Sequence, residues 1–540
     1  MNCSISPAVS MSGLFILPTE LIEKALKHLD HHSILTCRRV CRSLHALIDG
    51  STAIQFVIAF GSSGQEDGIY SLLGASERLK MLADHQTAWK KLQWREYTCV
   101  PTKGEMFALQ GGVYAECDDT SCIIYFTQLH SRLRGIDAKE WQVNLEFPFR
   151  DAAIDPTQDL LVTVGRNRSR NINLLSMSSG DVHPAAIAST ISLPSIPGLS
   201  NSTDYDIVID RDRLGILILI SEAPRELVIW NWKTGMIIMW LHGRKIKSAP
   251  IFLDERFVLV GRYFDSPADG NNYAELVIYD LRATSPQNFD VACAPYHCTF
   301  QFPPFSRGFS IFADPSADWE PRADLRAPFH ASPRDRLLLV GIRGLCLLIR
   351  SQSLLDHSHD PEFSTSHHVW SWGTWCSRDF HDLALLSDQR SSPTIHLRVY
   401  DCHPERIAPS KRNCLEMEGW RRLGPRGLYP WASNGMDSGV SAVPSAFCKD
   451  LTLPFQVDPY ATETVMLSQD TLVVLEHTGE SVVDLDFTVR ILFIWLLFLP
   501  RVRHYFRGKG IIIRMGEDHT QGSVTSCNET RRKGQGVAMD

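Results

Sequence analysis

The 540-residue sequence lacks both a secretory signal and an apolar run long enough to cross a membrane. Residues 1–16 contain no Lys or Arg, so the charged start of a signal peptide is missing. The longest apolar run, residues 491–499, would extend about 14 Å as a helix, against about 30 Å of hydrocarbon. The 14 cysteines lack the paired spacing of a disulfide framework. We therefore expect reduced thiols in the cytoplasm or nucleus, and no membrane partner.

Patterns for catalysis or metal binding are also missing. The sequence has no Gly-x-Ser-x-Gly, no His-Glu-x-x-His and no dinucleotide fingerprint. Two close cysteine pairs, Cys117 with Cys122 and Cys293 with Cys298, have no second pair at zinc-finger spacing. The first 486 residues carry a net charge of −12, which disfavours nucleic acid as the main partner. We therefore predict a protein that is not an enzyme, with no catalytic residue, metal or cofactor.

Residues 17–50 form the segment whose residue types point to one molecular task. Pro18 suits the first position of a helix, and an apolar stripe at helical spacing follows from Leu21 to Leu29. Residues 30–33 interrupt the stripe, and Ser33 is a reasonable N-cap for the next helix. The helical period resumes at residue 34 and ends near Gly50. Three short helices bury too little apolar surface to be stable alone, so their exposed apolar side chains need a partner.

The order of these residues resembles the F-box. The resemblance rests on Leu-Pro-x-Glu at 17–20, Leu-Asp at 29–30 and Val-Cys-Arg-x-Leu at 40–44, although Leu44 stands where many F-boxes have Trp. It implies docking on the Skp-type adaptor of a cullin-RING ubiquitin ligase and, through the adaptor, on a cullin. Carried onto this sequence, it implies an adaptor contact lined by Leu17, Pro18, Leu21, Ile22, Ile34, Leu35, Val40 and Cys41. The alternative is a helical hairpin that packs on the domain behind it.

Residues 51–100 continue with helical patterning and are predicted to be a helical linker. From residue 101 to about 486, short β-rich runs alternate with turn residues, as is typical of a mainly-β domain. A turn Asp precedes an apolar strand at 155–165, 210–220 and 254–261, and an aromatic residue followed by Asp or Asn closes several later strands. These recurrences resemble degenerate WD-type repeats, which implies an irregular β-propeller of four-stranded blades. The closing aromatic residues are then predicted to pack between blades: Trp230, Tyr279 and Tyr400.

The fold class expected is α+β multidomain, with a small N-terminal helical F-box followed by a mainly-β, irregular β-propeller. The length allows six to eight blades, of which about five are visible. Seven prolines between residues 286 and 328 favour a long loop there. Residues 1–16 are expected to be disordered.

Residues 487–540 match neither the F-box nor the blades. They carry nine Lys and Arg against four Asp and Glu, together with the apolar run at 491–499. The alternatives are a buried last strand, a basic anchor at a membrane interface, a disordered tail, or a translated intron or shifted frame at the end of the gene.

Two groups of residues are candidate contacts for a target protein. Trp370, Trp372 and Trp375 alternate with small polar residues, and they either anchor a ligand on a rim or fill the core between blades. Arg166 and Arg168 follow a strand, and they either contact a phosphate or acidic segment or lie solvated at a hairpin tip.

These patterns predict a non-catalytic adaptor. The F-box would hold the ligase and the β domain an unknown protein substrate, so that the lysines of the substrate lie near the ubiquitin-carrying enzyme. Two alternatives stay open: a propeller scaffold whose F-box-like helices pack on its own body, and a propeller that binds a small ligand.

Overall fold

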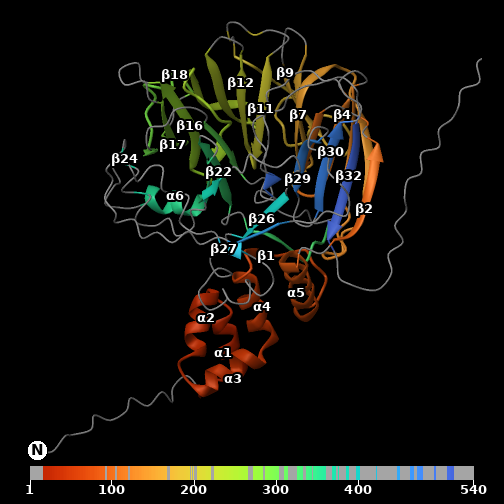
Figure 1. Cartoon of the computed structure of the whole chain (residues 1–540), viewed down its shortest axis with the longest axis vertical. Coiled ribbons are helices and arrows are strands. Elements are labelled where there is room, and N and C mark those ends of the chain that lie inside the picture. Colours follow the sequence, from red (N-terminus) through yellow and green to blue (C-terminus); the bar gives the residue numbers. More distant parts are fainter. Residues whose placement is uncertain are drawn as a thin grey trace, which may run out of the picture.

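The structure, a computed structural model, describes residues 16–359, 368–371 and 375 apart from short gaps, and eight strands between residues 385 and 515. The gaps lie at 92–93, 102, 104–105, 119–121, 167–170, 195, 197–198, 200–202, 221–223, 266–271, 284–285, 303–308, 314–324, 333–335 and 343–344. Figure 1 shows a group of helices at one end of a much larger β body. The expectation of disorder was for residues 1–16, of which all but residue 16 lie outside the described residues.

Five helices form the N-terminal group: α1 (Thr19–Leu26), α2 (His31–Arg38), α3 (Arg42–Gly50), α4 (Thr52–Gly61) and α5 (Ala75–Lys91). The three helices predicted within residues 17–50 are present, and α3 ends at Gly50 as expected. The linker prediction was wrong in part, because residues 51–100 also hold two strands, β1 (Gln65–Asp67) and β2 (Trp94–Pro101). Helix α4 lies at the centre of the group and packs against α2, α3 and α5.

Within the described residues, the β body contains seven sheets of four or five strands. Five of them follow the chain in order: β3 (Met106–Gln110), β4 (Val113–Asp118), β5 (Ile123–Gln128) and β6 (Lys139–Asn144); β7 (Phe149–Asp155), β8 (Leu160–Gly165), β9 (Asn171–Ser176) and β10 (Thr190–Ser192); β11 (Asp204–Asp210), β12 (Arg213–Leu219), β13 (Arg225–Asn231) and β14 (Met236–Gly243); β15 (Ile251–Phe252), β16 (Phe257–Asp265), β17 (Asn272–Asp280) and β19 (Cys298–Gln301); β20 (Phe309–Ala313), β22 (Leu337–Ile342), β23 (Leu345–Arg350) and β25 (Leu385–Ser387). These strands pair antiparallel. The runs predicted as strands at 155–165, 210–220 and 254–261 all lie in such sheets.

The other two large sheets combine strands from distant parts of the chain: β26 (Leu397–Asp401), β27 (Arg421–Arg422), β28 (Phe447–Asp450) and β31 (Leu492–Phe493); and β2, β29 (Thr462–Leu467), β30 (Thr471–His477) and β32 (Gly508–Met515). Strand β32 lies between β2 and β30 and pairs antiparallel with both. The first long strand after the helices therefore shares a sheet with the last of the described strands. The β region thus extends past residue 486, where we expected it to end.

Neighbouring sheets stack face to face through the side chains of their central strands. Because side chains alternate along a strand, Phe257 and Leu259 of β16 pack toward β22, while Val258 and Val260 pack toward β13. Both faces are buried, which explains the continuous apolar runs in the sequence. Trp230 and Tyr279 are buried between sheets, as predicted. The side chain of Tyr400 lies outside the description.

Arginine side chains connect neighbouring sheets at the ends of their strands. Arg150 Nε in β7 donates a hydrogen bond to the carbonyl oxygen of Thr203, 3.3 Å away, just before β11. Arg336 Nη1, just before β22, donates to the carbonyl oxygen of Phe252 in β15 at 2.8 Å. A guanidinium group can donate a hydrogen bond to a carbonyl oxygen at the end of a strand in the next sheet, so these contacts link adjacent sheets.

The proline-rich region differs from the predicted long loop. It contains β18 (Asn288–Asp290), β19, β20 and β21 (Phe329–Ala331). The strands fit between the prolines, since β19 lies between Pro295 and Pro303 and β20 between Pro304 and Pro315. Strand β18 pairs parallel with β14, and β24 (His368–Trp370) pairs parallel with β19 after the short helix α6 (Ser351–Ser358). The prolines mark the ends of these strands.

Among the described residues, no single helix has both the length and the apolar composition needed to cross a membrane. Helices α3 and α4 pass that test only as a pair, with a bend of 85° between them.

Candidate partner-docking surface

Helix α1 has one buried and one uncovered side. Pro18 is extended, with φ −52° and ψ 143°, and the helix begins at the next residue. Glu20 lies in the first turn, where the helix dipole favours a negative charge. Ile22 and Leu26 are buried, whereas Leu21, next to Ile22 in sequence, stays exposed. The apolar stripe predicted along this helix is therefore divided between a core and a surface.

Helices α2 and α3 are each fixed at the N-terminus by a side chain. Asp30, and not Ser33 as predicted, caps α2: its Oδ1 accepts a hydrogen bond from the backbone N–H of Ser33 at 3.0 Å, and its Oδ2 accepts one from the Ser33 hydroxyl at 2.7 Å. These bonds lower the pKa of Asp30. Cys41 caps α3, since its Sγ accepts from the N–H of Leu44 at 3.5 Å. Each cap satisfies a backbone N–H in the first turn of its helix.

An ion pair ties α2 to α3. The guanidinium of Arg38 donates two hydrogen bonds to the carboxylate of Asp49, from Nε at 2.6 Å and from Nη2 at 2.8 Å. This fork-to-carboxylate geometry fixes orientation as well as distance. The Arg38 bonds lower the pKa of Asp49, and they raise the pKa of Arg38. The pair holds the α2–α3 turn that carries Val40.

The core of the helical group depends on α4. Six buried side chains from α1 to α4 form it: Ile22, Leu26, Ile34, Leu44, Ile48 and Ile54. Ile54 belongs to α4, beyond the motif at 17–50, so the fourth helix completes the core that three short helices could not provide.

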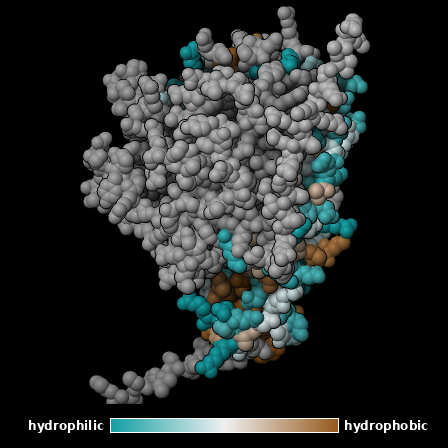
Figure 2. Space-filling model, turned by 45° about the vertical axis from the view of Figure 1, so that its right-hand side comes forward, coloured by the Kyte–Doolittle hydropathy of each residue, from teal (hydrophilic) through white to brown (hydrophobic). Residues whose placement is uncertain are grey.

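Several large apolar side chains of this group remain uncovered. Leu17, Leu21 and Val40 are 46%, 51% and 53% exposed, and Ile16 and Leu29 are exposed as well. Figure 2 shows apolar residues among polar ones at the helical end of the molecule. Exposed apolar residues that form a contiguous patch often mark a binding site on a monomeric protein, and four of the exposed residues here belong to the predicted adaptor contact. We define Leu17, Pro18, Leu21 and Val40 as the docking surface.

The remaining predicted contact residues lie elsewhere. Ile22 and Ile34 are 3% and 0% exposed and belong to the core of the helical group, so their contact with an adaptor stays a prediction. Helical spacing identifies both sets as apolar but does not say which set the fourth helix covers. Leu35 and Cys41 are partly buried, and Cys41 packs against the edge of the core.

A second group of uncovered apolar residues was not predicted. Ile69, Tyr70, Leu72 and Leu73 are exposed on the loop between β1 and α5. Their sequence carries no periodic pattern, only four apolar residues between Gly68 and Gly74. The loop is fixed at its end, because the N–H of Gly74 donates to Glu77 Oε2 at 3.0 Å and so caps α5.

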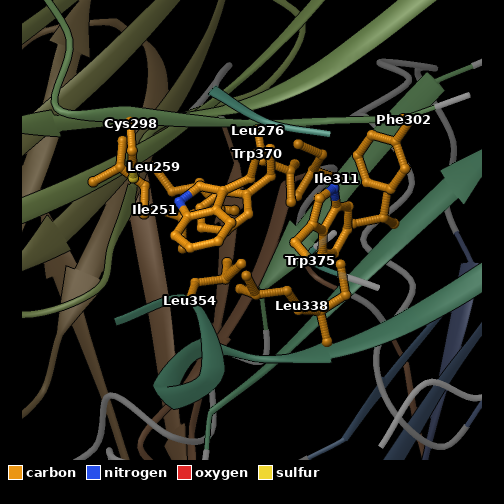
Figure 3. Packing of buried hydrophobic residues seen from close by; sticks show 14 of the residues in the cluster. Ile251, Leu259, Leu276, Cys298, Phe302, Ile311, Leu338, Leu354, Trp370 and Trp375 are labelled. Atoms are coloured by element: carbon orange, nitrogen blue, oxygen red, sulfur yellow. The ribbon is translucent and has the colours of Figure 1, made fainter. Parts of the chain in front are cut away.

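The tryptophans proposed as target contacts are inside the β body. Trp370 and Trp375 are buried in one apolar cluster between the sheet of β16 and the sheet of β22, as Figure 3 shows. Trp375 Nε1 donates to the carbonyl oxygen of Gln301 at 2.9 Å. Their burial excludes both indoles from a surface contact, and the core alternative holds for them. Trp372 lies outside the described residues.

Arg166 follows β8 and is partly exposed, and its backbone N–H donates to the carbonyl oxygen of Pro148 at 3.2 Å. Arg168 lies outside the described residues. A target contact by these two arginines therefore stays a prediction.

Residues suited to metal chemistry do not gather within the described part of the chain, where no group of three or more His, Cys, Asp or Glu is placed to hold an ion. Cys117 and Cys298 are buried thiols, and burial raises the pKa of Cys298 to about 12. A thiol with so high a pKa is a poor nucleophile and a poor metal ligand.

The helical group is thus a small domain whose exposed apolar side chains suit it for docking on a partner. Residues 14–52, which include α1 to α3, match the F-box domain family. The chain therefore carries an F-box domain. F-box domains bind Skp-type adaptors in Skp–cullin–F-box ubiquitin ligases, and they are typically adaptors rather than catalysts.

Comparisons of the whole chain with known proteins say less about it than the F-box match does. No curated protein matches the sequence. Similar solved structures include the uncharacterized protein lmo1340 from Listeria monocytogenes EGD-e, at 11% identity and a TM-score of 0.26, covering 47% of this chain and 65% of that one. Another is dihydro-heme d1 dehydrogenase NirN in complex with DHE, at 13% identity and a TM-score of 0.22, covering 46% and 44%. The chain spans less than two thirds of either protein, and at these scores neither defines its fold.

Proposed function

We propose that this protein is the substrate receptor of a Skp–cullin–F-box ubiquitin ligase. The observation that carries the proposal is that the F-box segment leaves Leu17, Leu21 and Val40 uncovered while its core is complete. A Skp-type adaptor would cover these side chains and link the chain to a cullin. Such a receptor would act in the cytoplasm or nucleus, in keeping with the free cysteines among the described residues.

The β body would hold the target as an irregular propeller. In support of a ring, successive sheets stack through shared apolar clusters, and β2 shares a sheet with β30 and β32. A ring closed by pairing the first strand with the last would leave only short edges unprotected. Arg166 and Arg168 are the remaining candidates for target contact in this proposal.

The mechanism would be proximity without catalysis by this chain. A target held on the β body has its lysines at a high effective concentration near the ubiquitin-carrying enzyme on the cullin. No general base or nucleophile is required of the receptor, because the ubiquitin arrives already activated on the ubiquitin-carrying enzyme.

The alternative of a scaffold whose helices seal against its own body predicts that the F-box surface is covered. Among the described residues, the helices contact the β body through α4, α5 and β1. Leu17, Leu21 and Val40 are exposed and are not part of that described contact. This distribution favours a surface reserved for another protein.

The test is co-purification of the full chain with a Skp-type adaptor and a cullin. We expect a stable complex with the wild type and its loss in Leu21→Asp. The matched control is Ile187→Asp, which places the same charge at an exposed apolar position of the β body. If wild-type protein elutes without adaptor at micromolar concentrations, the receptor function is rejected.

A further inference from the structure

A segment from the middle of the β body reaches back to the N-terminal helices. Residues 325–332, which we call the strap, lie between β20 and β22 and contain β21. β21 pairs antiparallel with β1, which lies between α4 and α5, with Gln65 opposite Ala331 and Asp67 opposite Phe329. The strap therefore makes backbone contact with a part of the chain about 260 residues earlier.

Buried side chains add apolar contacts to this strand pairing. Phe329 is fully buried against Phe60 of α4 and Leu82 of α5. Its ring meets Phe60 edge-on at 6.2 Å and His85 at 5.2 Å between centroids. Edge-to-face contact is a favoured arrangement of aromatic rings. One aromatic side chain of the strap therefore packs against both helices.

Polar contacts hold both ends of the pairing. The N–H of Ser332 donates to the carbonyl oxygen of Gly64 at 2.9 Å, and its hydroxyl donates to Glu66 Oε1 at 2.7 Å. At the other end the N–H of Gly68 donates to the carbonyl oxygen of Pro328 at 3.1 Å. A Cβ on Gly68 would overlap the carbonyl oxygen of Ala327, so only glycine allows this approach.

The strap also contacts the first sheet of the β body. Ala327 is buried against Ile136, which lies in the connection between β5 and β6. Gly135 in the same connection lies next to Met81 of α5, since a Cβ there would be 3.8 Å from the Met81 methyl group. The strap, helix α5 and the β5–β6 connection therefore meet at one joint, at the end of the β body where Figure 1 places the helices.

We propose that the strap is an orienting device, which fixes the helical group in one position relative to the β body. The strap contacts β1 and the α4–α5 pair on the helical side and the β5–β6 connection on the side of the β body, so it bridges the two parts. A partner docked on α1–α3 is then held at a constant distance and angle from whatever the β body binds. This orienting role belongs to the chain alone and does not depend on adaptor binding.

The test is a distance measurement on the full chain by pulsed electron paramagnetic resonance. Spin-labelled non-canonical residues replace Lys24 in α1 and Met236 in the β body, both exposed. We expect one narrow distance distribution in the wild type. Gly68→Ala, which forces the strap away, should broaden it, whereas Gly74→Ala should not, because a Cβ at Gly74 has its nearest neighbour 3.7 Å away.

Hydrogen exchange of the unmodified protein gives a second measurement that needs no variant. The amides of Gly68 and Ser332 should exchange as slowly as those of the central strand β8. A broad distribution in the wild type, an unchanged narrow one in Gly68→Ala, or fast exchange at these two amides would overturn the orienting role. None of these outcomes bears on adaptor binding.

Discussion

The substitution Leu21→Asp tests the docking surface most directly. Leu21 is 51% exposed on α1, next to the buried Ile22, and the helical core does not include it. Substitutions of surface side chains usually change the free energy of unfolding by about 0.5 kcal/mol or less. If the unfolding free energy of this variant is unchanged, a loss of binding is a loss of contact with the partner.

The size of the loss follows from the exposed fraction. Full burial of a leucine side chain contributes about 1.5–3 kcal/mol, so covering the exposed half of Leu21 contributes about 1 kcal/mol. A carboxylate at the same place adds a further penalty of about 2 kcal/mol, since it becomes a buried polar group without a partner. The sum of about 3 kcal/mol corresponds to a roughly 100-fold larger dissociation constant, which means weaker binding.

Titration calorimetry with the full chain and a purified Skp-type adaptor measures this constant. Thermal unfolding of each variant is recorded alongside, to show that Leu21→Asp and Ile187→Asp keep the wild-type fold. Binding of Leu21→Asp within about threefold of the wild type, with the adaptor bound by both, would refute the assignment of Leu21 to the docking surface.

Three other predictions concern stability. Ile34→Ala, in the helical core, should lower the free energy of unfolding by about 2–5 kcal/mol, as measured by urea titration followed by circular dichroism. It should weaken adaptor binding only to the extent that the helices unfold. Trp375→Ala should cost about 3–5 kcal/mol by leaving a cavity between two sheets; loss of target binding with unchanged stability would contradict its place in the core. Burial raises the pKa of Asp206 from 3.8 to about 6, with attraction to Arg225 opposing the shift. The folded state then binds the proton more tightly than the unfolded state, so stability falls as pH rises between these values. Asp206→Asn should therefore be more stable than the wild type at pH 7, by at most about 3 kcal/mol because Asp206 retains some accessible surface. The gain should vanish near pH 4. Equal urea midpoints of the two proteins at pH 7 would contradict this prediction.

Much of the β body could be predicted from local pattern. A strand places alternate side chains on opposite faces, so a continuous apolar run such as Leu337 to Val340 requires a neighbouring sheet on each side. This is why the burial of Trp230 and Tyr279 between sheets was predictable without knowing which sheets are adjacent.

Pairings between distant segments were not predictable, for a physical reason. Strand β32 has an apolar core at residues 511–513, but nothing local indicates that its partners are β2 and β30. The prolines between residues 286 and 328 were misleading for another reason, because a proline removes one N–H and says nothing about the residues between two prolines. Strand β19 needs only the four residues Cys298–Gln301.

At the docking surface, too, the motif predicts which residues are apolar, but the surrounding helices decide which of them are exposed. The F-box resemblance names eight residues, but Ile22 and Leu21 are adjacent in that set and have opposite roles. What separates them is Ile54 of α4, which lies outside the motif and covers one side of the short helices. We expect a substitution at Ile22 to act on folding and one at Leu21 to act on binding, so a loss of adaptor binding identifies the surface only when the unfolding free energy is unchanged. Of the eight residues, Leu17, Pro18, Leu21 and Val40 are exposed, so substitutions there should leave the unfolding free energy unchanged. These four positions are therefore the ones at which the receptor function is best tested.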